Sequence, residues 1–271
     1  MLQRWATLLI APLLIAPAEA VTIQASLTGF DAAEQRVFET VLGYWEQTIR
    51  TSFTVGISFS KEGLAEDTLS FASGFTAGID GLPLSATVQV DDRIGSAFGW
   101  FVDPTPETHE EFVPTADPSY FPGRRPGPAG QNYDLLSILH HEMAHVLGFS
   151  TFYRRFADKV GPSEFGALRK YQGESFATIL SSESQGTHLY DGLLDESYAF
   201  HYPDLMTSFQ SRGERVLPSE LDLAVLSDAF GYDVLAPTAP IPEPGAFALT
   251  AGAILVFAFH RKRAIRFRRC S

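Results

Sequence analysis

The chain has 271 residues, of which 45% are hydrophobic and 19% are charged, and it contains one cysteine. This composition excludes a disordered or collagen-like chain and supplies enough apolar residues for a sizeable core. The formal net charge of −12 argues against nucleic acid as a partner. A single cysteine excludes an internal disulfide framework.

The first 20 residues have the features of a secretory signal peptide. Arg4 supplies a basic start, an apolar run follows from Trp5 to Ile15, and residues 18–20 (Ala-Glu-Ala) form a small-x-small cleavage site. The apolar run is shorter than the roughly 20 residues that a membrane-spanning helix needs. We therefore expect export of the protein and removal of residues 1–20.

The first half of the remaining chain contains one clear helix and several strands. Asp31 and Glu34 have the spacing of a capping box, and apolar residues at helical spacing predict an amphipathic helix over 32–50. Alternation of apolar and polar residues predicts strands at 53–59 and 86–90, and a short aromatic strand is expected at 98–102.

The second half begins with a segment that we expect to be a loop. Residues 103–130 carry seven prolines and three glycines. A helical pattern then runs from Tyr133 to Gly148, which stands where a helix-ending glycine is expected. Residues 150–185 have a mixed pattern. A last helix is predicted to begin near Ser219 and to stop at Gly231.

The helix that ends at Gly148 contains the sequence His-Glu-Met-Ala-His at positions 141–145. Residues four apart lie on one face of a helix, so His141 and His145 can bind one metal ion. Two histidines, a further protein ligand and a water make up a catalytic zinc site. Glu142 would act as general base, taking a proton from the zinc-bound water and passing it to the leaving amine. His140 lies off this face, and we interpret it as structural.

The third zinc ligand is not fixed by this motif. In the compact HExxHxxGxxH pattern it would fall at position 151, which is Thr. His188 and His201 are the histidines between the motif and the last helix, and both precede a Pro-Asp-Leu-Met-Thr segment at 203–207. His201 is only five residues before Met206, which leaves little chain between a ligand and a turn beneath it.

The motif, Gly148 and the segment around Met206 resemble a metzincin zinc peptidase, and in particular the leishmanolysin-like kind with a distant third histidine. The resemblance covers about 131–235, with HEMAHVLGF as its specific part. It implies a Met-turn with Met206 beneath the zinc, and His188, in the context Gly-Thr-His-Leu, as the third ligand. It also implies that strand 85–90 borders the cleft and pairs with substrate.

Two other interpretations remain open. A different zincin class would use a glutamate as the third ligand, for which Glu164, Glu174 and Glu183 are candidates. The chain could also be a non-catalytic envelope or extracellular-matrix protein with a structural zinc site, although such a site would have no use for Glu142.

The C-terminal segment has the parts of a sorting signal. Pro242-Glu243-Pro244 is followed by an apolar run over 246–259 and then by an arginine-rich end. This order resembles the PEP-CTERM signal, which implies recognition by an exosortase-type membrane protease. Basic residues after an apolar run stay on the cytoplasmic side, so the tail would lodge in the inner membrane, transiently or permanently.

Together with the terminal signals, the resemblance to metzincins implies an exported α+β metallopeptidase with a zincin-like fold. Its N-terminal lobe would hold a twisted sheet and the active-site helix, and its C-terminal lobe the Met-turn and the final helix. The expected divisions are the signal peptide 1–20, the peptidase domain 21–236 and the linker and tail 237–271. Residues 21–244 carry 31 acidic and 13 basic side chains, a net charge of −18. Calcium at 91–92 or 191–196 is a further expectation, without an EF-hand pattern.

Overall fold

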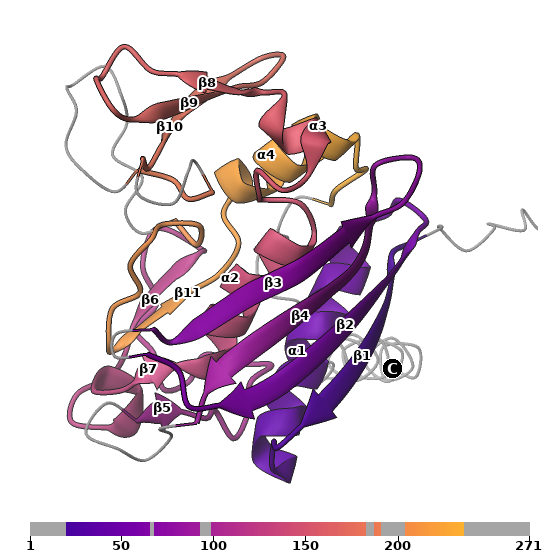
Figure 1. Cartoon of the computed structure of the whole chain (residues 1–271). Coiled ribbons are helices and arrows are strands. Elements are labelled where there is room, and N and C mark those ends of the chain that lie inside the picture. Colours follow the sequence, from indigo (N-terminus) through magenta and orange to yellow (C-terminus); the bar gives the residue numbers. More distant parts are fainter. Residues whose placement is uncertain (1–19, 66–67, 93–98, 183–186, 191–203, 236–271) are drawn as a thin grey trace, which may run out of the picture. The chain divides into compact units, whose positions relative to one another are not determined.

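The computed structural model describes residues 20–65, 68–92, 99–182, 187–190 and 204–235. It has a mixed α+β architecture with several sheets (Figure 1). The predicted signal peptide and sorting tail lie outside the described residues, apart from Ala20 at one border. None of the helices in the described part is long and apolar enough to cross a bilayer.

The largest sheet has four strands in the order β1-β2-β4-β3. They are β1 (Thr22–Thr28), β2 (Thr54–Glu62), β4 (Pro83–Asp91) and β3 (Ser70–Ala77). Strands β1, β2 and β4 are parallel, and β3 runs antiparallel to β4 at the edge of the sheet. Alternating side chains explain its one buried face: Val55, Ile57 and Phe59 of β2 are buried, while Ser58 between them is exposed.

The strands predicted at 53–59 and 86–90 are confirmed, but the assignment of 85–90 as the border of the cleft is wrong. Strand β4 has neighbours on both sides, β2 and β3, so its backbone cannot pair with a substrate. The edge strands are β1 and β3, and the sequence of β3, SFASGFTA, has too few strong strand formers to be found by alternation.

Helix α1 (Ala32–Thr48) packs with α2 (Leu135–Val146) against this sheet. The predicted capping box is present: Asp31 accepts hydrogen bonds from the first turn, and the Glu34 side chain accepts one from the Asp31 N–H. Glu34 is 2% exposed and also binds Lys61 of β2 at 2.7 Å, which ties the start of α1 to the sheet.

The segment 103–130 is less irregular than predicted. It contains β6 (Tyr120–Pro122), which pairs with β11 (Glu214–Val216), and a 3-10 turn, η1 (Pro128–Gly130). The aromatic strand predicted at 98–102 is present as β5 (Trp100–Phe101), paired with β7 (Tyr133–Asp134). These pairs cross more than 30 residues of sequence, so proline and glycine content could not reveal them.

The remaining elements follow α2. Within 150–185, which have no clear sequence pattern, the described residues form α3 (Arg154–Ala157) and a small antiparallel sheet of β8 (Val160–Pro162), β9 (Arg169–Gln172) and β10 (Ala177–Leu180). Helix α4 (Glu220–Phe230) begins after the N-cap Ser219 and ends at Gly231, as predicted. It contacts α3.

Candidate metal centre

The two motif histidines project from one side of α2, which is buried along its whole length. His141 and His145 have only 7% and 8% of their surface exposed. His140 lies elsewhere: its ring packs against Tyr44 and Trp45 of α1, at centroid distances of 4.8 and 6.1 Å. Its interpretation as a structural histidine agrees with this packing.

The first turn of α2 is anchored by a buried ion cluster that the sequence did not reveal. Asp134, the N-cap, accepts hydrogen bonds from Ser137 and two from the Arg215 guanidinium, both at 2.9 Å. Arg215 is fully buried and also binds Asp103 at 2.7 Å. The helix that carries the motif is thereby fixed to β11 and to the segment after β5.

The last turn of α2 is shaped by Gly148, whose φ of +133° suits glycine. The chain reverses there, and the Phe149 carbonyl returns to accept a hydrogen bond from His145 Nδ1 at 2.7 Å. A Cβ atom at position 148 would lie 2.2 Å from the Phe230 ring of α4. Gly148 therefore serves both the turn and the close approach of α4.

His188 reaches the site through backbone pairing with a segment distant in sequence. The Leu189 N–H donates to the Met206 carbonyl at 2.7 Å, and Leu189 also bridges to β10 at Leu180. The neighbouring Leu205 carbonyl accepts a hydrogen bond from His141 Nδ1 at 2.8 Å. The turn around Met206, which is fully buried, thus contacts both His141 and the segment that carries His188.

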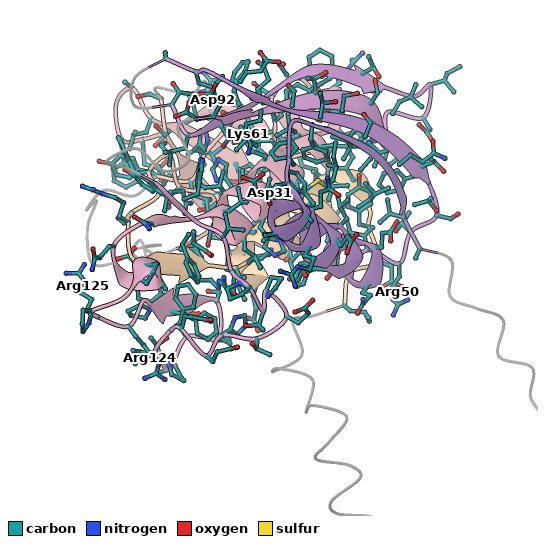
Figure 2. All side chains as sticks on the ribbon, turned by 90° about the horizontal axis from the view of Figure 1, so that it is seen from below. Asp31, Arg50, Lys61, Asp92, Arg124 and Arg125 are labelled. Atoms are coloured by element: carbon teal, nitrogen blue, oxygen red, sulfur yellow. The ribbon has the colours of Figure 1, made fainter. Side chains whose placement is uncertain are left out.

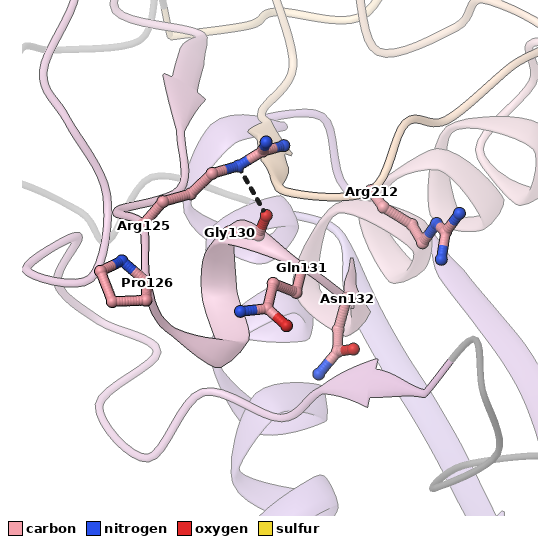
Figure 3. A pocket seen from close by; sticks show the side chains of 6 residues that line it. All are labelled: Arg125, Pro126, Gly130, Gln131, Asn132 and Arg212. Carbon is pink, nitrogen blue, oxygen red and sulfur yellow. Dashed lines mark hydrogen bonds between the residues drawn. The ribbon is translucent and has the colours of Figure 1, made fainter.

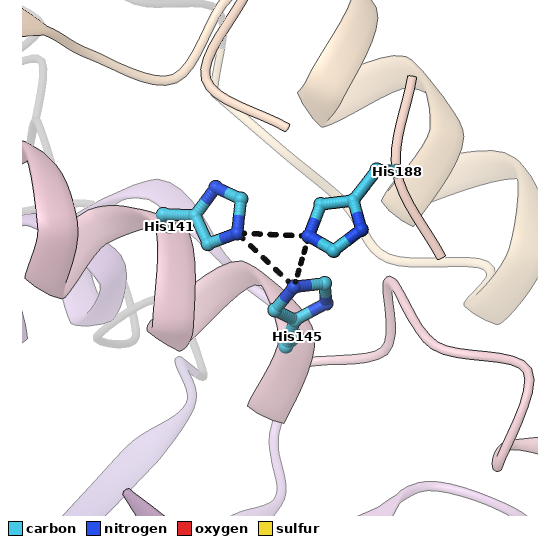
Figure 4. Close-up of side chains that lie close together, drawn as sticks. All are labelled: His141, His145 and His188. Atoms are coloured by element: carbon cyan, nitrogen blue, oxygen red, sulfur yellow. Dashed lines mark hydrogen bonds between the residues drawn. The ribbon is translucent and has the colours of Figure 1, made fainter. Parts of the chain in front are cut away.

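The three imidazoles meet at one point (Figure 4). Their Nε2 atoms form a triangle with sides of 3.1, 3.1 and 3.2 Å. In His141 and His145, Nδ1 faces a carbonyl oxygen, which can only accept, so the ring proton lies on Nδ1 and Nε2 presents a lone pair. Two such lone pairs directed at one point beside the His188 ring form an arrangement that a cation between the rings can satisfy.

Burial also keeps these rings uncharged. Removal from water lowers the pKa of His141 to about 4, against the opposing effect of its bond to Leu205. The same cause lowers the pKa of His145 to about 3 and that of His188 well below its usual value. Neutral imidazoles are the form that binds metal.

Glu142 lies beside the first ligand and is 4% exposed. Its Oε1 accepts a hydrogen bond of 2.5 Å from the Ser70 hydroxyl of β3, while Oε2 is buried with no hydrogen-bond partner in the described structure. Burial raises the pKa of Glu142 to about 7, although the bonds from Ser70 and the Ala72 backbone act to lower it. A carboxyl group in this state can accept and return a proton near neutral pH.

The three histidines form a group that can hold a metal ion. Zinc prefers such nitrogen ligands, and tetrahedral coordination with Zn–N bonds of about 2.0–2.1 Å would separate the nitrogens by about 3.3 Å. The observed triangle is within about 0.2 Å of that spacing, so the donor set fits zinc.

The structure thus brings together His141, His145 and His188, which the sequence analysis selected. The alternative ligands His201 and Glu183 lie outside the described residues. Glu164 and Glu174 are described but do not belong to the group of possible metal ligands.

The structure supports neither of the predicted calcium positions. Among the described residues, Asp91 and Asp92 do not belong to a group of three or more possible metal ligands, and 191–196 lie outside the described residues.

A separate pocket of about 890 Å³ opens near the start of α2 and contains none of these site residues (Figure 3). Arg125 is oriented there by a hydrogen bond from its Nε to the Gly130 carbonyl at 3.0 Å. Arg124 and Arg125 both project from the surface of this acidic protein (Figure 2). The lining residues are Arg125, Pro126, Gly130, Gln131, Asn132 and Arg212.

Compared with models of protein families and with curated proteins, the chain matches none.

Proposed function

We propose that the chain is an exported zinc-dependent endopeptidase of the metzincin type. The observation that carries this proposal is the convergence of three neutral imidazoles, with Nε2 atoms 3.1–3.2 Å apart, beside a buried glutamate. A catalytic zinc site has three protein ligands and one open position. In the described part of the chain the group has three members, which agrees with an open fourth position.

His141, His145 and His188 would hold the ion through Nε2. When bound, zinc supplies Lewis acidity, which lowers the pKa of a water and polarises a scissile carbonyl. Glu142 would take the proton of the attacking water at Oε2, the oxygen without a hydrogen-bond partner among the described residues, and release it to the departing amine. The turn with Leu205 and Met206 would keep His141 in orientation through the bond to Nδ1.

A polypeptide substrate would lie along β3, because this strand is one of the two edges of the sheet and contacts α2, the helix that carries the motif. Edge strands bind extended peptides through backbone hydrogen bonds. The edge thereby replaces strand 85–90 as the proposed border of the cleft. The alternative of a structural zinc site is less favoured because it leaves the buried, protonatable Glu142 without a role.

The test compares the purified full-length protein with Glu142→Gln, a variant of nearly equal shape. Both should bind one zinc ion per chain by metal analysis, whereas cleavage of an unfolded protein should fall by about 100- to 10,000-fold in the variant. Chelation should abolish wild-type cleavage, and added zinc should restore it. Stoichiometric zinc without any cleavage by the wild type would favour the structural alternative.

Export and sorting are proposed from the terminal segments alone. The intact mass of the protein recovered from the host envelope or medium tests both: loss of residues 1–20 would support export. Loss of the segment after Pro244 would support removal of the tail by an exosortase-type protease. A mass that retains the tail would instead indicate a permanent membrane anchor.

A further inference from the structure

Ser70 stands out because its hydroxyl contacts the proposed general base from an element 72 residues away in sequence. It opens β3, and its Oγ lies 2.5 Å from Glu142 Oε1. The side chain of Ser70 shares a face of β3 with the buried Ala72, since residues i and i+2 of a strand share a face, and β3 contacts α2.

The bond from Ser70 restricts the Glu142 carboxylate to one orientation. The first oxygen, Oε1, is bound by the strand, whereas the second, Oε2, is buried and has no hydrogen-bond partner in the described structure. Glutamate has three rotatable side-chain bonds, and its terminal torsion is broad. A fixed partner for Oε1 is therefore needed if Oε2 is to stay directed at the reacting water.

We propose that Ser70 is a positioning residue: its hydroxyl holds Oε1 of Glu142 so that Oε2 remains available to the attacking water. This inference rests on the proposed function, because it assigns Glu142 the role of general base. The edge strand β3 would then have two functions. The strand proposed to bind the substrate backbone would at the same time orient the base that acts on that substrate.

The first test measures kcat, KM and zinc content of the full-length protein and of three variants. Ser70→Ala should lower kcat by about 10- to 100-fold, the usual effect of removing a partner that orients an active-site group. KM and zinc content should stay unchanged, since Ser70 contacts neither the ligands nor, in this account, the substrate. Ser70→Thr retains a hydroxyl and should recover most of the loss.

Ser58→Ala is the matched control, because Ser58 also carries a strand hydroxyl but lies on the inner strand β2, on the face opposite the buried Val55, Ile57 and Phe59. It should behave like the wild type. If Ser70→Ala keeps kcat within about twofold of the wild type, or if Ser70→Thr is as slow as Ser70→Ala, the positioning role is refuted while the peptidase proposal stands. An inactive wild type with bound zinc would instead refute the proposed function.

A crystal structure of zinc-loaded Ser70→Ala tests the positioning role even if the wild type is inactive. The Glu142 carboxylate should turn away from its wild-type orientation or become disordered. A carboxylate that keeps the same position without the hydroxyl would overturn the inference, because the surrounding packing would then suffice to orient it.

Discussion

Replacement of Gly148 by alanine should be among the most damaging single-methyl changes in this protein. The added Cβ would lie 2.2 Å from Cε2 and 2.6 Å from Cζ of Phe230. Carbon atoms in contact are normally about 3.5–4.0 Å apart, so the ring or the turn must move by more than about 1 Å. The backbone itself, at a φ of +133°, is also unsuited to alanine.

These two effects add up. Backbone strain of this kind costs about 1–3 kcal/mol, and overpacking of a filled core costs about another 1–3 kcal/mol. We therefore expect Gly148→Ala to lower the free energy of unfolding by about 2–6 kcal/mol. Because Phe149 follows directly and its carbonyl binds His145, a displaced turn should also weaken zinc binding.

Urea unfolding of the zinc-free proteins measures the loss in free energy of unfolding, and a zinc titration measures the loss in zinc affinity. The double variant Gly148→Ala/Phe230→Ala separates the cost of overpacking from that of backbone strain, since removal of the ring relieves the collision but leaves the strain. The cost of the alanine should fall by about 1–3 kcal/mol in that background. Gly43→Ala is the control: a Cβ there, inside α1, would meet only Gln47 at 3.9 Å and should stabilise by about 0.5–1 kcal/mol. A Gly148→Ala protein within about 0.5 kcal/mol of the wild type would refute this reasoning.

Three further predictions concern the supports of the site. Arg215→Met leaves two buried aspartates without their cation and should cost about 3–5 kcal/mol in urea unfolding; a loss below about 1 kcal/mol would contradict the buried cluster. His188→Ala should weaken zinc binding in a competition titration by about 100-fold or more, whereas His201→Ala should leave it unchanged, and the reverse result would exchange the two roles. Burial raises the pKa of Asp222 to about 7, so the folded protein holds a proton that the unfolded chain releases near its ordinary value of 3.8. The stabilisation from this bound proton is present at low pH and is lost as the pH rises from 3.8 towards 7. Over that pH interval the stability of Asp222→Asn relative to the wild type should therefore increase, by at most about 1.4 kcal/mol per pH unit. A difference that is constant with pH would show that Asp222 does not titrate in this range.

Local signals explain which parts of the fold were predictable. Helix α1 begins at Asp31 and α4 at Ser219, each through a capping box contained within four residues, and both assignments hold. The edge strand β3 was missed because alanine, glycine and serine fill most of it. The order of strands in the sheet was also missed, and with it the correct edge, because pairing of β4 with β3 and β2 leaves no mark in the sequence of β4.

The site residues also divide into those that local sequence signals reveal and those that they do not. His141, Glu142 and His145 could be selected because helical periodicity places them within one turn of each other. His188 came from a family resemblance and from its neighbours in sequence, whereas the structure holds it through backbone pairing of Leu189 with Met206. Ser70 and Arg215 bind their partners across 72 and 81 residues. No short-range pattern distinguishes such a serine or arginine from an exposed one.

The proposed function requires that His141, His145 and His188 hold one catalytic zinc ion. Anomalous diffraction at the zinc edge, from crystals of the zinc-loaded full-length protein, tests this directly. We expect a single strong peak about 2.0–2.1 Å from the Nε2 atom of each histidine, with a fourth position open to water. A peak coordinated by other residues, or a fourth protein ligand closing the site, would contradict it.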